Sequence, residues 1–299
     1  MIRTCFSTIG CPDWSFSDMI RLGQQAGFDG VEIRLVERET DLLAVPDLGA
    51  AALPERRREL DEAGFAVCGL ASSVSFDSTD AAERERQLDV GRAYLDLAAE
   101  LDARFVRVFG DTIAEGVSRE ATIEQVSEGL DRLGEYAATL GREVIIETHG
   151  DFSRSELVAD TMARVESPAV GILWDTHHPW RFHDEPLATT YARFADRVRH
   201  THWKDSVTRP AAGDTSGTHQ AAEQAHALMT GHQHADYVLF GGGEFPVFEC
   251  LGLLQRGGYD GWYSYEWEKM WHPELEPPEL ALPLFSDKIR HLHALLPGR

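Results

Sequence analysis

The chain has 299 residues, of which 43% are hydrophobic and 26% charged, and its formal net charge at pH 7 is -22. This length and apolar content suit one large α/β barrel or two ordinary domains, while the negative charge disfavours a general nucleic-acid-binding protein because it repels phosphate backbones. No run of about 18 apolar residues could span a membrane and no apolar signal segment follows Met1, so we expect a soluble, cytoplasmic protein.

Short apolar runs alternate with longer helical patterns along the chain. Most of the runs are rich in Val, Ile and Phe, which is typical of parallel strands buried on both faces. The eight predicted strands are Thr4–Ile9, Gly30–Ile33, Ala66–Ala71, Phe105–Phe109, Val144–Glu147, Gly171–Asp175, Val198–His202 and Gly261–Glu266. The predicted helices are Ser17–Gln25, with Ser17 as its N-cap, Glu55–Ala63, Asp80–Glu100, Glu120–Leu140, Glu156–Val165, Leu187–Phe194, Phe245–Leu254 and Glu279–Leu296.

Eight strand–helix units in this order favour a closed parallel (β/α)8 TIM barrel over an open doubly wound sheet. A dinucleotide-binding sheet is also disfavoured because no GxGxxG motif follows the first strand. No repeat or domain linker is visible, so we predict a single domain over residues 1–299. The long polar segment 205–243 interrupts the pattern after the seventh strand. There it would be an insertion on the active face, either a lid or substrate-binding loop or a disordered surface loop.

The four cysteines are Cys5, Cys11, Cys68 and Cys250. They form no CxxC pair and are too few for a disulfide framework, which fits a reducing compartment. We interpret all four as small buried hydrophobic residues.

Four consecutive predicted strands, the fifth to the eighth, end in an acidic residue or a histidine. In such barrels the functional residues lie at the C-terminal ends of the strands. The residues are Glu147, Asp175, His202 and Glu266. A carboxylate beside apolar residues is costly to bury unless a partner compensates its charge. Three carboxylates and one imidazole suit Mn²⁺, Mg²⁺ or Co²⁺, with Zn²⁺ and Fe²⁺ left open.

Each of these residues alone has an ordinary structural role open to it. Glu147 could pair with an arginine or cap a helix, and Asp175 could cap the segment that follows it. His202 could be a core histidine, and Glu266 could form an ion pair with Lys204 or an arginine. Their common position on adjacent strand ends favours the metal interpretation for the group.

Five short motifs lie on or directly after predicted strands. They are Gly30-Val31-Glu32-Ile33-Arg34, Glu147-Thr148-His149, Trp174-Asp175-Thr176-His177-His178, His200-Thr201-His202-Trp203-Lys204-Asp205 and Gly261-Trp262-Tyr263-Ser264-Tyr265-Glu266. In this order they resemble the xylose-isomerase-like barrel superfamily over nearly the whole chain. That superfamily includes tagatose/allulose-type 3-epimerases, hydroxypyruvate isomerase, inosose dehydratase and endonuclease IV.

The resemblance implies that Glu147, Asp175, His202 and Glu266 bind one divalent metal ion. It also implies that Glu147 and Glu266 act as acid/base groups on opposite faces of the substrate. The histidine three residues after the strand-six aspartate, His178, would touch the substrate.

Two neighbouring positions extend this set. His200 and Lys204 alternate with His202, so a regular strand would point all three side chains the same way. Glu268 has the same relation to Glu266 and stays open as the alternative ligand.

We therefore predict the catalytic residues Glu147, Glu266, His178 and Lys204. The predicted substrate-binding residues are Trp14, His149, His200 and Arg107, and further candidates are Arg34, Trp203 and Trp267. Arg107 lies within the fourth predicted strand, where a buried guanidinium would need Glu32 or Glu147 as its partner.

The resemblance implies an isomerase or epimerase that acts on a small sugar, ketose or cyclitol. A base would remove the proton alpha to a metal-bound carbonyl, and the metal would stabilise the enediolate. The alternative is an inosose-type or keto-acid dehydratase, because the His-x-His-x-Lys-Asp run at 200–205 is similar to that of the dehydratase branch. The same site can support all three reactions.

Two other functions fit the residues less well. An endonuclease IV-like enzyme would need more histidines, and the strand ending at Ser72 has none. A non-catalytic binding barrel would have no need for both carboxylate bases. We expect no nucleic-acid or membrane partner and a possible homo-oligomer, since relatives often form dimers or tetramers. The lack of a phosphate loop favours an unphosphorylated substrate, although a helix N-terminus could bind phosphate without a motif.

Overall fold

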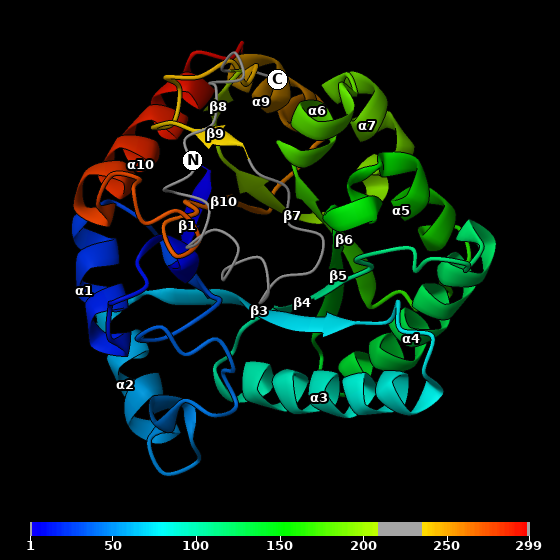
Figure 1. Ribbon diagram of the computed structural model, residues 1–299. Coiled ribbons are helices and arrows are strands. Elements are labelled where there is room, and N and C mark those ends of the chain that lie inside the picture. Colours follow the sequence, from blue (N-terminus) through cyan, green and yellow to red (C-terminus); the bar gives the residue numbers. More distant parts are fainter. Residues whose placement is uncertain (1, 209–234, 298–299) are drawn as a thin grey trace.

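The computed structural model describes residues 2–208 and 235–297. Eight parallel strands close into a barrel with helices around its outside (Figure 1), which confirms the predicted (β/α)8 fold. The barrel strands are β1 (Arg3–Ser7), β2 (Gly30–Ile33), β3 (Ala66–Ser75), β4 (Phe105–Phe109), β5 (Glu143–Glu147), β6 (Val170–Asp175), β7 (Val198–Trp203) and β10 (Trp262–Tyr265). Around the barrel they follow the order β1-β10-β7-β6-β5-β4-β3-β2.

The helices lie in the sequence between these strands, as expected. They are α1 (Phe16–Gln25), α2 (Leu53–Ala63), α3 (Ala81–Glu100), α4 (Arg119–Thr139), α5 (Ser155–Met162), α6 (His178–His183), α7 (Leu187–Phe194), α9 (Val247–Arg256) and α10 (Pro278–Ala294). Every residue of β2, β4, β6 and β10 is buried. Side chains on one face fill the barrel, and those on the other pack against helices, which explains the continuous apolar runs.

Side-chain caps decide where several helices begin. The N-cap of α1 is Ser15, and the prediction of Ser17 was wrong by two residues. The Ser15 hydroxyl accepts a hydrogen bond from the Asp18 N–H at 3.2 Å, and the Asp18 carboxylate accepts one from the Ser15 N–H. This reciprocal capping box satisfies two helix-end donors, whereas the Ser17 hydroxyl donates to the Glu59 carboxylate at 3.1 Å. Asp80 caps α3 by accepting from the Ala82 N–H at 2.9 Å.

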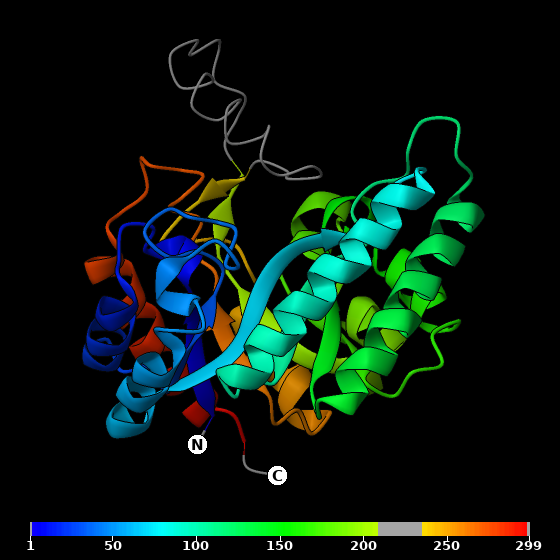
Figure 2. The same cartoon turned by 90° about the horizontal axis from the view of Figure 1, so that it is seen from below.

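The parallel strands place all their C-terminal ends at one mouth of the barrel. In Figure 2 both chain termini lie at the opposite end from this mouth. A short antiparallel ladder of β8 (Ser206–Val207) and β9 (Asp236–Tyr237) rises on the mouth side, after β7. These two strands belong to the predicted insertion 205–243, of which residues 209–234 lie outside the described residues. The prediction of a lid or loop there stays open.

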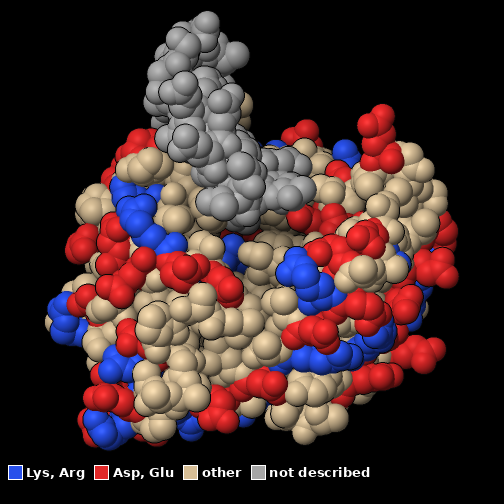
Figure 3. All heavy atoms as spheres, turned by 60° about the horizontal axis from the view of Figure 1, so that its bottom comes forward, with Lys and Arg blue, Asp and Glu red and all other residues tan. Residues whose placement is uncertain are grey.

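The surface and the cysteines agree with the composition. Figure 3 shows Asp and Glu side chains spread over the face drawn, with Lys and Arg in small groups between them. None of the described helices combines the length and low polarity needed to cross a bilayer.

All four cysteines are free and buried, as predicted. Burial raises the pKa of the Cys11, Cys68 and Cys250 thiols well above the usual value.

Glycines in the outer helices allow close packing against the barrel. A Cβ atom at Gly129 in α4 would lie 2.4 Å from a ring atom of Phe76. We expect Gly129→Ala to lower the free energy of unfolding by about 1–3 kcal/mol through overpacking, although alanine favours a helix by about 1 kcal/mol. Gly252→Ala in α9 is the matched control, because its Cβ would meet only the end of the Arg256 side chain. Urea unfolding measures both, and equal stability of the two variants would contradict this account.

Candidate metal centre and active site

Four buried acidic and histidine side chains meet at the mouth of the barrel. Glu147 ends β5, Asp175 ends β6, His202 lies in β7 and Glu266 directly follows β10. These four strands are consecutive neighbours in the barrel, and one donor atom from each residue lies within 4.8 Å of the others. The structure therefore brings the four residues together; that they bind a metal ion stays a prediction.

His202 is held so that one ring nitrogen faces the three carboxylates. Its Nε2 lies 2.9 and 3.0 Å from the two carboxylate oxygens of Glu32. Its Nδ1 lies 3.2 Å from Glu266 Oε2, 3.5 Å from Glu147 Oε1 and 4.0 Å from Asp175 Oδ2. A carboxylate that accepts from one imidazole nitrogen and so fixes the other is the usual support of a histidine metal ligand.

The charge balance of this cluster favours a cation. Burial lowers the pKa of His202, but the carboxylates of Glu266, Glu32 and Glu147 outweigh burial and raise that pKa well above its usual value. Burial also raises the pKa of Asp175 to about 7, even though Lys204 acts to lower it. Without a metal, protons on these side chains relieve the excess negative charge. A divalent cation would displace them and compensate the same charge.

The donor atoms also fit a divalent cation. Among the described residues, the buried Nδ1 of His202 forms no hydrogen bond, a costly arrangement unless another group satisfies it. Three carboxylates and one imidazole are ligands that Mn²⁺, Mg²⁺ or Co²⁺ accept. The residues present therefore fit the predicted metal.

Lys204 is fully buried beside this cluster, as its alternation with His202 predicts. Its ammonium lies 2.8 Å from both Asp175 Oδ2 and Glu268 Oε1 and forms a short contact with Glu266. Glu268 thus contacts the lysine and is not part of the four-residue group, which favours Glu266 as the strand-eight ligand. Lys204 also lies 3.1 Å from Nε2 of His178.

The carboxylate of Glu32 lies inside the barrel and pairs with histidines. It accepts from Nε2 of His200 at 2.7 Å and from the hydroxyl of Ser264 at 3.1 Å, besides its contacts with His202. Burial raises the pKa of Glu32, but His202 and His200 outweigh it and hold that pKa far below the usual value. Of the two partners considered for Arg107, Glu32 was therefore wrong. Arg107 Nε lies 3.3 Å from Glu147 Oε2 instead.

A very small cavity of about 10 Å³, roughly the room for one water molecule, opens beside the metal-ligand candidates. Among the described residues its lining comprises carboxylates, cations, histidines and two apolar side chains: Glu147, Glu266, Glu268, Arg34, Arg107, His149, His178, Ile9 and Phe109. Besides Glu147 and Glu266, this lining includes three residues that were predicted to bind substrate or to act in catalysis, namely Arg107, His149 and His178. His149 Nδ1 lies 3.3 Å from Asp111 Oδ1, a contact that the sequence did not indicate.

Two predicted substrate-binding residues lie elsewhere. Trp14 packs edge-on against Phe6 with the ring centres 6.1 Å apart, and it is not part of the cavity lining. His200 lies deeper in the barrel with Glu32. A substrate role for these two residues has no support in the geometry, and for Trp14 core packing accounts for its burial.

Asp205 is a structural residue that sequence reasoning missed. Its two carboxylate oxygens accept hydrogen bonds from four backbone N–H groups, all between 2.9 and 3.0 Å; the donors are Ser206, Gly241, Gly243 and Phe245. Asp205 thereby joins the two ends of the insertion next to Lys204. The only signal in the sequence was its place in the motif at 200–205.

We compared the chain with protein families, with curated proteins and with solved structures. The family model described as "Xylose isomerase-like TIM barrel" matches residues 20–286. An inosose dehydratase from Lacticaseibacillus casei is 28% identical over 148 residues, which are 49% of this chain and 47% of that protein. The chain thus spans about half the length of this relative. A fructoselysine 3-epimerase from Escherichia coli O157:H7 is 21% identical over 283 residues, 91% of this chain and 93% of that protein.

A solved structure resembles the whole barrel. The probable 3-DHS dehydratase involved in petrobactin synthesis from Bacillus anthracis has a TM-score of 0.74 and 15% sequence identity. The comparison covers 97% of this chain and 99% of that one. At this identity the likeness concerns the fold.

Removal of the buried ammonium tests the charge balance. We expect Lys204→Met to lower the free energy of unfolding of the metal-free protein by about 3–5 kcal/mol, because it leaves buried carboxylates uncompensated. Lys288→Met is the control, since among the described residues that ammonium donates to the carbonyl oxygens of Phe240 and Gly241 and to no carboxylate. For this variant we expect a loss below about 1 kcal/mol. Urea unfolding after chelation measures both variants. Equal losses of unfolding free energy in the two variants would show that the Lys204 ammonium does not stabilise the buried carboxylates.

Proposed function

The chain belongs to the xylose isomerase-like TIM barrel family, and from this premise we propose that it is a divalent-metal-dependent isomerase or epimerase of a small sugar, ketose or cyclitol. The observation that carries the proposal is the buried group of Glu147, Asp175, His202 and Glu266, whose donor atoms converge beside a polar cavity. The bound metal would supply Lewis-acid polarisation of a substrate carbonyl. The remaining steps belong to side chains of this chain.

Two carboxylates are suited to move a proton. Burial raises the pKa of Glu147, but Arg107 and His202 outweigh it and keep that pKa below its usual value. Burial likewise opposes ionisation of Glu266, but His202 and Lys204 hold its pKa well below the usual range. Both are therefore anionic at neutral pH, and either can remove the proton alpha to a carbonyl. Return of the proton at the neighbouring carbon isomerises the substrate, and return on the opposite face epimerises it.

Arg107 and Arg34 complete the polar side of the cavity. Arg34 donates to the Ser73 hydroxyl at 2.9 Å and to the Thr40 carbonyl at 3.2 Å. Burial, with a further contribution from Arg107, lowers the pKa of Arg34 to about 10, so the guanidinium stays charged at neutral pH. Two fixed cations beside Glu147 and Glu266 favour a hydroxyl- or carbonyl-rich substrate, because their remaining N–H groups can donate to its oxygens.

His178 is suited to position Lys204. Burial, with a further effect of Lys204, lowers the pKa of His178 well below its usual value, so the imidazole is neutral. Its Nδ1 lies 3.0 Å from the Thr148 carbonyl oxygen, which only accepts, so Nδ1 carries the hydrogen. The Nε2 lone pair is then left to accept from the Lys204 ammonium at 3.1 Å.

A dehydratase is the second candidate, and Lys204 is the observation that favours it. Loss of a β-hydroxyl after proton removal needs an acid that protonates the leaving oxygen. The Lys204 ammonium, next to Glu266 and at the mouth of the barrel, can donate that proton. The inosose dehydratase and the fructoselysine epimerase among the relatives leave both outcomes open for this chain.

Metal content tests the ligand set. After chelation and reloading with Mn²⁺, we expect about one ion per chain in the wild type and at least a tenfold weaker affinity in Glu147→Gln and Glu266→Gln, which keep shape but lose charge. Glu268→Gln is the matched control: it is equally buried and contacts Lys204, and it should retain the metal. Mass spectrometry gives the metal content. Absence of Mn²⁺ in the wild type, or loss in Glu268→Gln alone, would contradict the assignment.

Exchange with solvent tests the chemistry. In D₂O the Mn²⁺-loaded protein should place deuterium at the carbon alpha to the carbonyl of a ketohexose or an inosose, because every proposed outcome begins with that proton. We expect Glu266→Gln to slow this exchange about 10²–10⁴-fold. Mass spectrometry of the products then separates an isomer or epimer from a product that has lost water. A metal-loaded wild type that exchanges no proton in either class would contradict the proposal.

A further inference from the structure

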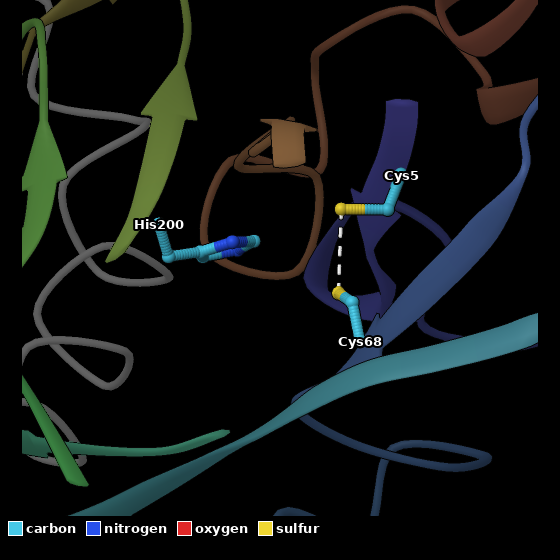
Figure 4. Close-up of side chains that lie close together, drawn as sticks. All are labelled: Cys5, Cys68 and His200. Atoms are coloured by element: carbon cyan, nitrogen blue, oxygen red, sulfur yellow. Dashed lines mark hydrogen bonds between the residues drawn. The ribbon is translucent and has the colours of Figure 1, made fainter. Parts of the chain in front are cut away.

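A second group of potential metal ligands lies inside the barrel, away from the mouth. Cys5 of β1, Cys68 of β3 and His200 of β7 converge there. The two Sγ atoms are 3.3 Å apart, and a ring nitrogen of His200 lies within 4.8 Å of both sulfurs. Figure 4 shows the imidazole directed toward the thiol pair. The two cysteines belong to an apolar cluster with Phe105, Ile145, Leu173 and Trp262.

The histidine of this group has an unsatisfied nitrogen. His200 is 1% exposed, and its Nε2 lies 2.7 Å from Glu32 Oε2. Because an ionised carboxylate only accepts hydrogen bonds, Nε2 carries the hydrogen and the Nδ1 lone pair is left over. Nδ1 has no hydrogen-bond partner among the described residues. An unpaired nitrogen at this depth is costly, unless a ligand occupies it.

Glu32 fixes both histidines of β7 in the same way. It accepts from Nε2 of His200 and from Nε2 of His202, and in neither ring does Nδ1 form a hydrogen bond within the part of the chain that the structure describes. For His202 that nitrogen faces three carboxylates. For His200, one ring nitrogen lies within 4.8 Å of the two sulfurs of Cys5 and Cys68. The barrel thus holds an oxygen-rich and a sulfur-rich set of donors that share one carboxylate support.

A disulfide is a poor alternative for the two cysteines. β2 lies between β1 and β3 in the barrel, so the backbones of Cys5 and Cys68 are roughly 9 Å apart at the usual strand spacing. A disulfide requires Cα atoms about 4.4–6.8 Å apart. A cation bonded to each sulfur at about 2.3 Å adds length between them and needs no such approach.

We propose that Cys5, Cys68 and His200 bind a thiophilic d10 cation, Cu⁺ or Zn²⁺, at a structural site separate from the one at the mouth. Thiolate and imidazole ligands select these ions, whereas carboxylates select Mg²⁺ or Mn²⁺. Both thiols lose their protons to solvent as the two metal–sulfur bonds form, and no oxidation is involved. The ion would link β1, β3 and β7 across the barrel. This inference does not depend on the proposed enzymatic function.

The site is fully buried, so it should be loaded while the chain folds. The full-length protein is produced in medium supplemented with Cu or with Zn, and then treated with a chelator. X-ray absorption at the metal edge reports the atoms around the bound ion. We expect sulfur neighbours in at least one of the two preparations, and the preparation that shows them identifies the ion.

Variants locate the sulfur donors. Cys68→Ala should lose the sulfur neighbours and about one metal ion per chain. Cys250→Ala, which removes a buried cysteine of α9, should lose neither. Circular dichroism checks that both variants fold. If Cys68→Ala does not fold, the X-ray absorption spectrum of the wild type alone tests the proposal. Only oxygen or nitrogen neighbours in both wild-type preparations would overturn the proposal. So would a Cys5–Cys68 disulfide in the native protein, detected by the loss of two hydrogen masses.

Discussion

Burial of several carboxylates in one barrel mouth is the constraint on which the rest of the site depends. The buried carboxylates there include those of Glu32, Glu147, Asp175, Glu266 and Glu268, with Asp111 and Asp205 buried nearby, and they outnumber the buried cations Arg34, Arg107 and Lys204. The buried acidic side chains therefore leave an excess of negative charge. The pKa values of Asp175 and His202 are raised, which agrees with this excess because a proton on either group reduces the negative charge. A divalent cation would reduce this excess, so charge as well as ligand type favours the proposed metal.

The sequence predicted the elements whose information is local or periodic. Apolar runs located all eight barrel strands within a few residues, because burial on both faces leaves an unbroken apolar pattern. The convergence of Glu147, Asp175, His202 and Glu266 could also be anticipated, since a closed parallel barrel brings all its C-terminal strand ends to one mouth.

Other features could not be predicted, because they depend on contacts across the barrel. Whether Glu32 meets Arg107 or the β7 histidines is set by the stagger of the strands, which a single sequence does not reveal. Similarly, Trp14 follows the first strand yet packs into the core against Phe6. The short helix α6 was missed because its six residues, led by His178 and Pro179, are too few for a periodic signal.

The same arrangement of side chains suits several reactions, and the fold does not choose among them. Proton removal alpha to a carbonyl needs only a polarising cation and an ionised carboxylate. What differs between isomerisation, epimerisation and dehydration is where a second proton is delivered. Under the proposed function, that choice would rest with Glu147, which pairs with Arg107, and with Glu266, which contacts Lys204.

The four hydrogen bonds of Asp205 have a consequence for how this chain can vary. They fix the residues just before and just after the insertion onto one carboxylate beside the barrel. The chain is therefore held at a closed base on both sides of the stretch between positions 208 and 235. For a flexible connection of any sequence between two such fixed ends, the closure entropy changes only slowly with length, by about 0.6 kcal/mol for each doubling. Evolution or protein engineering can exchange this stretch for a shorter, longer or unrelated one while the barrel and its charged mouth stay in place.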